Sequence, residues 1–146
     1  TLAYVEYDNW HFYRNGNTLD TRRRGIELWR KGIDAGDNMA RNNLAWALCT
    51  APEPELFDAA AGLAQAERLH EVANNMPAWV DTVAACRAAA GDYSGAVELQ
   101  RAVMASFTPA EIEEDAGRDQ GFTARLALYQ SGERYVEAHR SDADSD

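Results

Sequence analysis

The chain has 146 residues, of which 46% are hydrophobic and 26% charged, and its net charge is −10. These proportions are ordinary for a globular protein, and the length suffices for one domain with a continuous core. The acidic balance argues against nucleic-acid binding, which depends on Lys and Arg side chains that neutralise phosphates. No apolar run approaches the ~18 residues that cross a bilayer, so we expect no membrane span.

The start of the chain and its composition bear on its origin. The first residue is Thr1 rather than Met, so we expect a chain that was processed or cut from a longer protein. The abundance of alanine and arginine favours a bacterial source with a GC-rich genome. We expect a cytoplasmic protein, and the alternative is a periplasmic or secreted protein that has lost a signal sequence.

Apolar residues recur along most of the chain with the helical period of about 3.6 residues. No segment shows the strict alternation of a β-strand, and short loops favour antiparallel neighbours. The sequence therefore predicts an all-α protein with one domain over residues 1–140 and a disordered acidic tail over 141–146. The predicted helices lie at about 2–14, 19–35, 38–50, 58–73, 78–90, 92–106 and 109–131.

Capping residues mark several helix boundaries. Four predicted helices begin at a side chain that can accept a hydrogen bond from a free backbone N–H group. Two of these positions follow a glycine, Gly36 or Gly91, that can end the preceding helix. The four capping residues are Asp37, Asp58, Asp92 and Thr108, the last in a capping box with Glu111.

A proline-containing loop is predicted between the helices at 38–50 and 58–73. Pro52 and Pro54 cannot lie inside a helix, so an extended loop joins the two helices. We expect the apolar side chains of Leu56 and Phe57 to hold this loop against the body of the protein.

Two segments of the chain repeat one another. Residues 42–49 align with residues 81–88 when Leu44 is matched to Val83, and these two positions are 39 residues apart. A helical-hairpin repeat of about 34 residues with about five inserted residues has this period. The proline-containing loop accounts for the insertion.

The residues at 77–104 resemble a tetratricopeptide repeat. Val83-Ala84 matches the pair of a core residue and a small residue in the first helix, and Gly91-Asp92-Tyr93 matches the turn between the helices with its aromatic residue. Ala96 matches the small residue of the second helix. The preceding hairpin has the corresponding residues Leu44-Ala45-Trp46, Gly62-Leu63 and Ala66. The resemblance implies an alpha-alpha superhelix, a solenoid of stacked antiparallel helical hairpins.

The parts of that solenoid follow from the same alignment. They are a weak unit at 1–36, units at 37–76 and 77–107, and a capping helix at 108–131. In the weak unit, we expect a buried stripe on the second helix, formed by Ile26, Leu28, Trp29 and Ile33.

The chain also departs from the family pattern. The first tryptophan of the family is replaced by Arg41 and Val80, its glycine by Ala45 and Ala84, and its tyrosine by Leu48 and Arg87. Alpha-solenoid relatives with shorter helices are therefore the alternative fold.

The resemblance further implies that the first helix of each hairpin lines a concave groove that receives a peptide or helix of a partner protein. The residues that it puts in this groove are Asn42, Asn43, Trp46, Asp81 and Ala85. Asparagine amides both donate and accept hydrogen bonds, and a tryptophan is a frequent anchor at interfaces. The alternative is that the capping helix or the first hairpin covers Trp46.

The two cysteines, Cys49 and Cys86, lie in apolar helical stretches and form no CxxC motif. We expect two small buried side chains. A disulfide or a reactive thiol is the alternative.

No pattern of catalytic or metal-binding residues emerges. The three histidines are scattered over different predicted segments, at His11, His70 and His139. An acidic cluster stands at a helix start, where the macrodipole favours negative charge, and its residues are Glu111, Glu113, Glu114 and Asp115. The basic run Arg22-Arg23-Arg24 is interpreted as a solvated helix face or as partners of nearby acids. We therefore expect no catalysis, metal or cofactor.

Two classes of function stay open. The first is a protein–protein interaction scaffold that binds a neutral or basic segment of another protein. The second is a structural or self-assembling subunit, including a homo-oligomer, or a repeat domain that packs against other domains of a larger protein.

Overall fold

The computed structural model describes residues 19–137 of the chain. The helix predicted at about 2–14 and the acidic tail predicted at 141–146 lie outside these residues.

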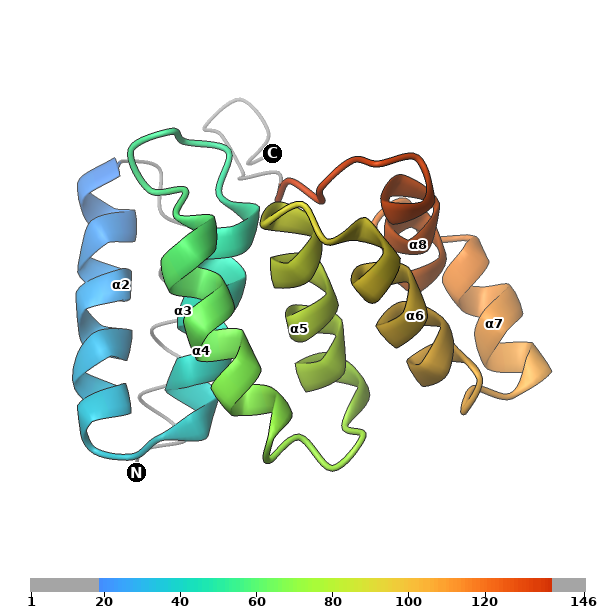
Figure 1. Ribbon diagram of the computed structural model, residues 1–146, viewed down its shortest axis with the longest axis horizontal. Coiled ribbons are helices and arrows are strands. Elements are labelled where there is room, and N and C mark those ends of the chain that lie inside the picture. The colour runs from blue at the N-terminus through green and yellow to red at the C-terminus, as the bar shows by residue number, and fades with distance from the viewer. Residues whose placement is uncertain (1–18, 138–146) are drawn as a thin grey trace, which may run out of the picture.

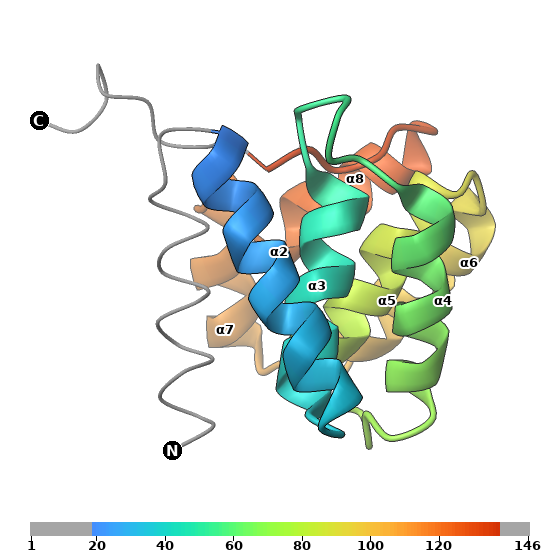
Figure 2. The ribbon, with the colours of Figure 1, turned by 90° about the vertical axis from the view of Figure 1, so that its left-hand side faces the viewer.

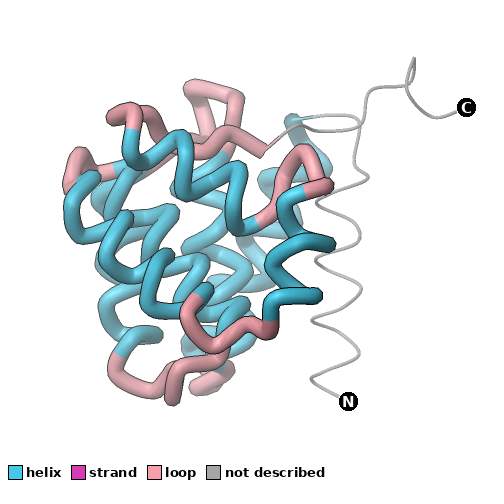
Figure 3. The backbone as a smooth tube through the Cα atoms, turned by 90° about the vertical axis from the view of Figure 1, so that its right-hand side faces the viewer, coloured by secondary structure: helices cyan, strands magenta, loops and turns pink. Residues whose placement is uncertain are grey.

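The described residues form seven α-helices joined by short loops (Figure 1). Their bounds are α2 Leu19–Asp34, α3 Asn38–Thr50, α4 Ala59–His70, α5 Pro77–Ala89, α6 Tyr93–Met104, α7 Pro109–Ala116 and α8 Phe122–Gln130. The backbone coloured by secondary structure contains no strand in this part of the chain (Figure 3). The predicted all-α class is confirmed. No helix within the described range is long and apolar enough to cross a bilayer.

The predicted capping residues start four of these helices. Their side chains accept hydrogen bonds from backbone N–H groups of the first turn: Asp37 from Met39 at 2.9 Å, Asp58 from Ala61 at 3.1 Å, Asp92 from Gly95 at 3.0 Å and Thr108 from Glu111 at 3.2 Å. The Glu111 carboxylate accepts the N–H of Thr108 at 2.9 Å, which completes the capping box. Gly36 and Gly91 end their helices with φ angles of 87° and 94°, a left-handed conformation that glycine adopts without steric cost.

One predicted helix is wrong. The single helix expected at 109–131 is two helices, α7 and α8, separated by residues 117–121. Asp115 in α7 accepts hydrogen bonds from the backbone N–H groups of Phe122 and Thr123, at 2.9 and 2.8 Å, and so caps the start of α8. A Cβ atom at Gly121 would lie 2.5 Å from Oδ1 of Asp115. The close approach of the two helices therefore requires glycine at this position.

Most helices pack mainly on their neighbours in the sequence, but α3 also packs on α5, and α8 packs more on α6 than on α7. Helices α2 to α6 lie side by side with alternating directions (Figure 1), and α4 and α7 lie on opposite sides of the molecule (Figure 2). Helix α2 contacts α3 through the buried residues Ile26 and Trp29, with Ile33 packed beside them. Leu28, which we expected to be buried, is 36% exposed. Residues 26, 29 and 33 share one helical face, and residue 28 lies on another.

The proline-containing loop between α3 and α4 is confirmed. Leu56 is buried, and Phe57 packs against the same cluster of α2 and α3 side chains. The backbone N–H of Asp58 donates to the carbonyl of Leu48 at 3.0 Å. The loop is thus fixed to the end of α3.

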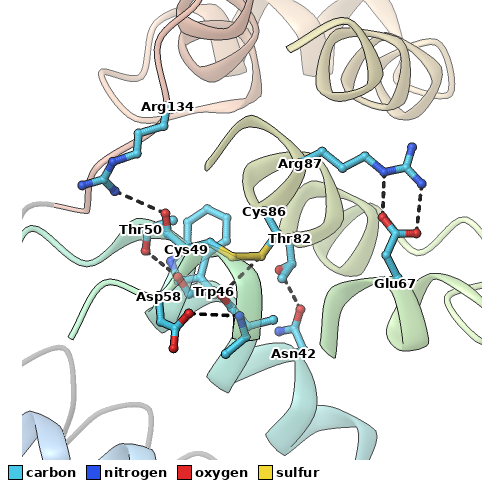
Figure 4. Close-up of a disulfide and its surroundings, with 12 residues drawn as sticks. Asn42, Trp46, Cys49, Thr50, Asp58, Glu67, Thr82, Cys86, Arg87 and Arg134 are labelled. Carbon is cyan, nitrogen blue, oxygen red and sulfur yellow. Dashed lines mark hydrogen bonds and ion pairs between the residues drawn. A yellow bond between two sulfur atoms is a disulfide. The ribbon is translucent and has the colours of Figure 1, made fainter. Parts of the chain in front are cut away.

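A disulfide joins Cys49 of α3 to Cys86 of α5, with their Cα atoms 5.1 Å apart (Figure 4). Both side chains are fully buried, as predicted, but they are not the separate thiols that we expected. A Cβ atom at Gly62 of α4 would lie 2.4 Å from Sγ of Cys49, so α4 approaches the disulfide closely at a glycine. The bond fixes the first helices of two neighbouring hairpins to one another.

Candidate functional site

The five residues predicted to line a groove lie on α3 and α5, the two helices that the disulfide joins. Asn42 is half-buried, and its Oδ1 accepts the hydroxyl of Thr82 at 2.7 Å (Figure 4). Trp46 is also half-buried. The other three are less than a tenth exposed: Asn43, Asp81 and Ala85. The two helices therefore meet as predicted, but most of this surface is covered within the described part of the chain.

A C-terminal segment, residues 131–137, covers part of this surface. It leaves α8 through Gly132, whose φ angle is 74°, and returns to the C-terminal end of α3 (Figure 1). Tyr135 and Glu137 are buried, whereas Val136 between them is 44% exposed. This alternation is that of an extended chain lying on a surface.

The segment pairs with backbone groups that the end of α3 would otherwise leave free. The last four backbone carbonyls of α3 belong to residues 47–50. The carbonyl of Ala47 accepts the N–H of Ala51, and the carbonyl of Leu48 accepts the N–H of Asp58, at 3.0 Å each. The guanidinium of Arg134 donates to the carbonyl of Cys49 at 3.3 Å, and the N–H of Glu137 donates to the carbonyl of Thr50 at 2.8 Å. A cation at this position is also favoured by the negative end of the helix dipole. The segment thus completes α3.

Trp46 is the centre of the side-chain contacts. Its indole N–H donates to Oε2 of Glu137 at 2.7 Å, and its ring lies 5.6 Å from the ring of Tyr135. The guanidinium of Arg125 in α8 lies 5.5 Å from the Trp46 ring and 5.4 Å from the Tyr135 ring. Helix α8 therefore contacts Trp46, in agreement with the alternative that a capping helix covers it, and the C-terminal segment adds to that cover.

A buried ion pair lies under this surface. Arg125 donates from Nε to Oδ1 of Asp81 at 3.0 Å and from Nη2 to Oδ2 at 2.9 Å. Gln100 of α6 donates to the same Oδ1 at 3.1 Å. Burial raises the pKa of the Asp81 carboxyl above its ordinary value, and the interactions with Arg125 and Gln100 oppose that shift. Asp81 thus joins three helices through polar contacts and is not presented to solvent.

The remaining charged residues noted in the sequence have structural partners or lie exposed. Arg22 pairs with Glu53 of the proline-containing loop at 3.1 Å, and the rest of its basic run is exposed. His70 is exposed, and the other two histidines lie outside the described residues. Within residues 19–137, no group of three or more His, Cys, Asp or Glu side chains is placed to hold a metal ion.

Sequence reasoning missed the residues that fill this site: Arg125, Arg134, Tyr135 and Glu137. The capping helix predicted at 108–131 ends just before Gly132. The available signal was Tyr135, the single aromatic residue after Gly132. Arg134 directly precedes this tyrosine, and Glu137 follows it two positions later.

Comparison with protein-family models, with curated proteins and with solved structures finds no match for this chain. The tetratricopeptide resemblance stays a prediction.

Proposed function

We propose that this protein is an interaction scaffold of the tetratricopeptide type, a short solenoid that binds a segment of a partner protein and performs no catalysis. The binding surface would be the face of α3, α5 and α8 around Trp46. The observation that carries the proposal is that this face already holds an extended segment of the same chain, through a backbone hydrogen bond to α3 and a hydrogen bond from Trp46.

The chemistry of the face supports binding rather than catalysis. The buried carboxylate of Asp81 is engaged at both oxygens by Arg125. The groups that remain for a ligand are carbonyls at a helix end, an indole N–H and aromatic rings. Such groups recognise an extended peptide through its backbone and a few anchoring side chains.

We further propose that the protein works in an oxidising compartment, the periplasm or the extracellular space, rather than in the cytoplasm as first expected. Support comes from the disulfide between Cys49 and Cys86. Disulfides persist where the environment is oxidising and are rare where thiol reductants keep cysteines reduced.

Affinity capture with the full chain tests the proposed function. The wild-type chain, a Trp46→Ala variant and an Arg68→Ala variant would each be immobilised and exposed to an extract of the source cells. Arg68 is exposed on α4 and serves as the matched control. We expect a retained protein that is lost with Trp46→Ala and kept with Arg68→Ala. Retention that is equal for all three chains would contradict the proposal.

The mass of the protein in solution separates the two classes of function. A scaffold for other proteins stays monomeric as its concentration rises, whereas a self-assembling subunit gains mass. Light scattering over a hundredfold range of concentration makes this comparison.

A further inference from the structure

We propose that the site occupied by residues 131–137 recognises a partner segment with a basic residue, a tyrosine immediately after it and a glutamate two positions further on. The partner would bind by displacing the chain's own segment. This inference rests on the proposed function and specifies the chemistry of the partner. Each position of the pattern has its own recognition group on the protein.

The basic position is set by the C-terminal end of α3. Arg134 donates to the carbonyls of Cys49 and Ala51 at 3.3 Å each (the contact with Cys49 is visible in Figure 4). Its guanidinium also lies 4.0 Å from the ring of Phe57. Carbonyl groups, a helix dipole and an aromatic ring together favour a cation here. The net charge of −10 adds attraction over a longer range.

The aromatic position is set by Trp46 and Arg125. Tyr135 is 6% exposed, and its ring contacts both of these side chains. Its hydroxyl donates to Oε1 of Gln120 at 2.9 Å. The hydroxyl contact distinguishes tyrosine from phenylalanine at this position.

The acidic position is set by the indole N–H of Trp46. Oε2 of Glu137 accepts it at 2.7 Å, while the N–H of Glu137 donates to Thr50 at 2.8 Å. The side chain and the backbone of one residue thus bind to the same turn of α3. Val136, at the position between tyrosine and glutamate, is 44% exposed, so the site places no demand on that residue.

The attachment of the segment is suited to exchange. Its first three residues, 131–133, are exposed, and their N–H groups donate to carbonyls of α8, so Arg134, Tyr135 and Glu137 make the contacts of the segment with α3. A tethered segment of this kind has an effective concentration of about 1 mM. If a free copy of the segment binds the empty site with a Kd of about 0.1 mM, it would bind about tenfold more weakly to a site that holds the tethered segment. A partner segment that binds more tightly than this would displace it.

The test uses the full chain and a fluorescent peptide of residues 131–137 with blocked ends. A Tyr135→Ala variant loosens the resident segment without altering the site that receives it. Anisotropy should show that the peptide binds this variant about tenfold more tightly than it binds the wild type. An Arg134→Ala variant, which changes a half-buried side chain, is the second chain if circular dichroism shows that Tyr135→Ala unfolds.

Two controls assign the binding to the proposed contacts. A peptide with alanine in place of tyrosine should not bind the loosened chain. Adding Trp46→Phe to that chain keeps an aromatic ring but removes the indole N–H, and should abolish the gain in peptide affinity. Equal peptide affinity for wild-type and loosened chains, or affinity that is independent of Trp46, would overturn the proposal.

Mass measurements on the same chains exclude another occupant. If the wild type is dimeric and Tyr135→Ala is monomeric, the segment is exchanged between two copies, and the proposal of a different partner is overturned. If the peptide does not bind but a partner is captured and lost with Trp46→Ala, the proposed sequence pattern is rejected and the proposed function is kept. Trp46-independent capture would reject the proposed function itself.

Discussion

Gly62 is the residue at which α4 comes closest to the disulfide. A Cβ atom there would lie 2.4 Å from Sγ of Cys49 and 3.3 Å from Cβ of Leu48. Alanine gains about 1 kcal/mol over glycine in a helix interior, but overpacking a buried contact costs about 1–3 kcal/mol. Because the disulfide prevents the sulfur from moving aside, we predict that Gly62→Ala lowers the free energy of unfolding in urea.

Two comparisons assign that cost to the sulfur. A Cβ atom at Gly117 would meet nothing closer than 3.5 Å, so Gly117→Ala should leave stability nearly unchanged. In a chain with both cysteines replaced by alanine, Gly62→Ala should become neutral or stabilising. A cost that is the same in both backgrounds would mean that the sulfur is not the obstacle.

Asp115 gives a prediction for pH. Burial raises the pKa of its carboxyl, but the hydrogen bonds from Thr123 and Phe122 and the nearby Arg125 outweigh this and lower the pKa below its ordinary value. A lowered pKa in the folded state stabilises the fold at pH values above the ordinary carboxyl pKa, and this stabilisation is lost as the pH falls through the lowered value. In Asp115→Asn the amide nitrogen cannot accept the hydrogen bond that one carboxylate oxygen accepts now, so the variant should be less stable by about 1 kcal/mol at pH 7.

The test is the melting temperature of both chains from pH 7 to pH 3. The difference between wild type and Asp115→Asn should shrink as the pH falls. Glu113→Gln, at an exposed position on the same helix, should show a small difference at every pH. A difference between wild type and Asp115→Asn that grows on acidification would contradict the assigned role.

At the scale of elements, the disulfide ties α3 to α5 across 37 residues of sequence. Closing a loop of this length in the unfolded chain is worth about 4 kcal/mol in the chain-entropy model. We predict that replacing both cysteines with alanine lowers the melting temperature by about 10 °C. Thiol titration of the unreduced, denatured wild type should find no free thiol. Two titratable thiols would contradict both the disulfide and the proposed oxidising compartment.

Elements that depend on nearby residues could be predicted, and those that depend on distant ones could not. The caps at Asp37, Asp58 and Asp92 are local hydrogen bonds between residues two or three positions apart. The pairing of Cys49 with Cys86 depends on the offset between α3 and α5, which no local pattern records. The split of the predicted helix at 109–131 depends on Asp115, whose capping contacts lie in the next helix.

The candidate site was predicted in part for the same reason. The resemblance to a tetratricopeptide repeat was enough to place Asn42, Trp46 and Asp81 on neighbouring helices. It was not enough to show that Tyr135 and Glu137 return to that surface, because an extended segment of seven residues has no helical period. Its hydrogen bond with Trp46, made by Glu137, spans 91 residues of sequence.

At the scale of the whole molecule, stability should vary along the row of helices. Helix α7 packs mainly on α8, and most of its residues are exposed. Helices α3 and α5 lie among several neighbours and are joined by the disulfide. We predict that hydrogen exchange is fastest in α7 and slowest in α3 and α5, because exchange follows local opening. Equal protection of α7 and α5 would show that the chain opens as a single unit.

The contact between Arg134 and the carbonyl of Cys49 joins residues 85 positions apart and has a consequence for synthesis. A ribosome adds about 5–20 residues per second, so the end of α3 emerges roughly 4–17 s before Arg134 does. Throughout this interval water must hydrate the carbonyls of Cys49 and Thr50, whose partners are Arg134 and Glu137. The hairpins can pair with one another as they emerge, but these two carbonyls acquire their native partners only when residues 134–137 arrive. The last native contacts to form during synthesis are therefore made by residues near the C-terminal end of the described chain. They complete α3, which is its second described helix.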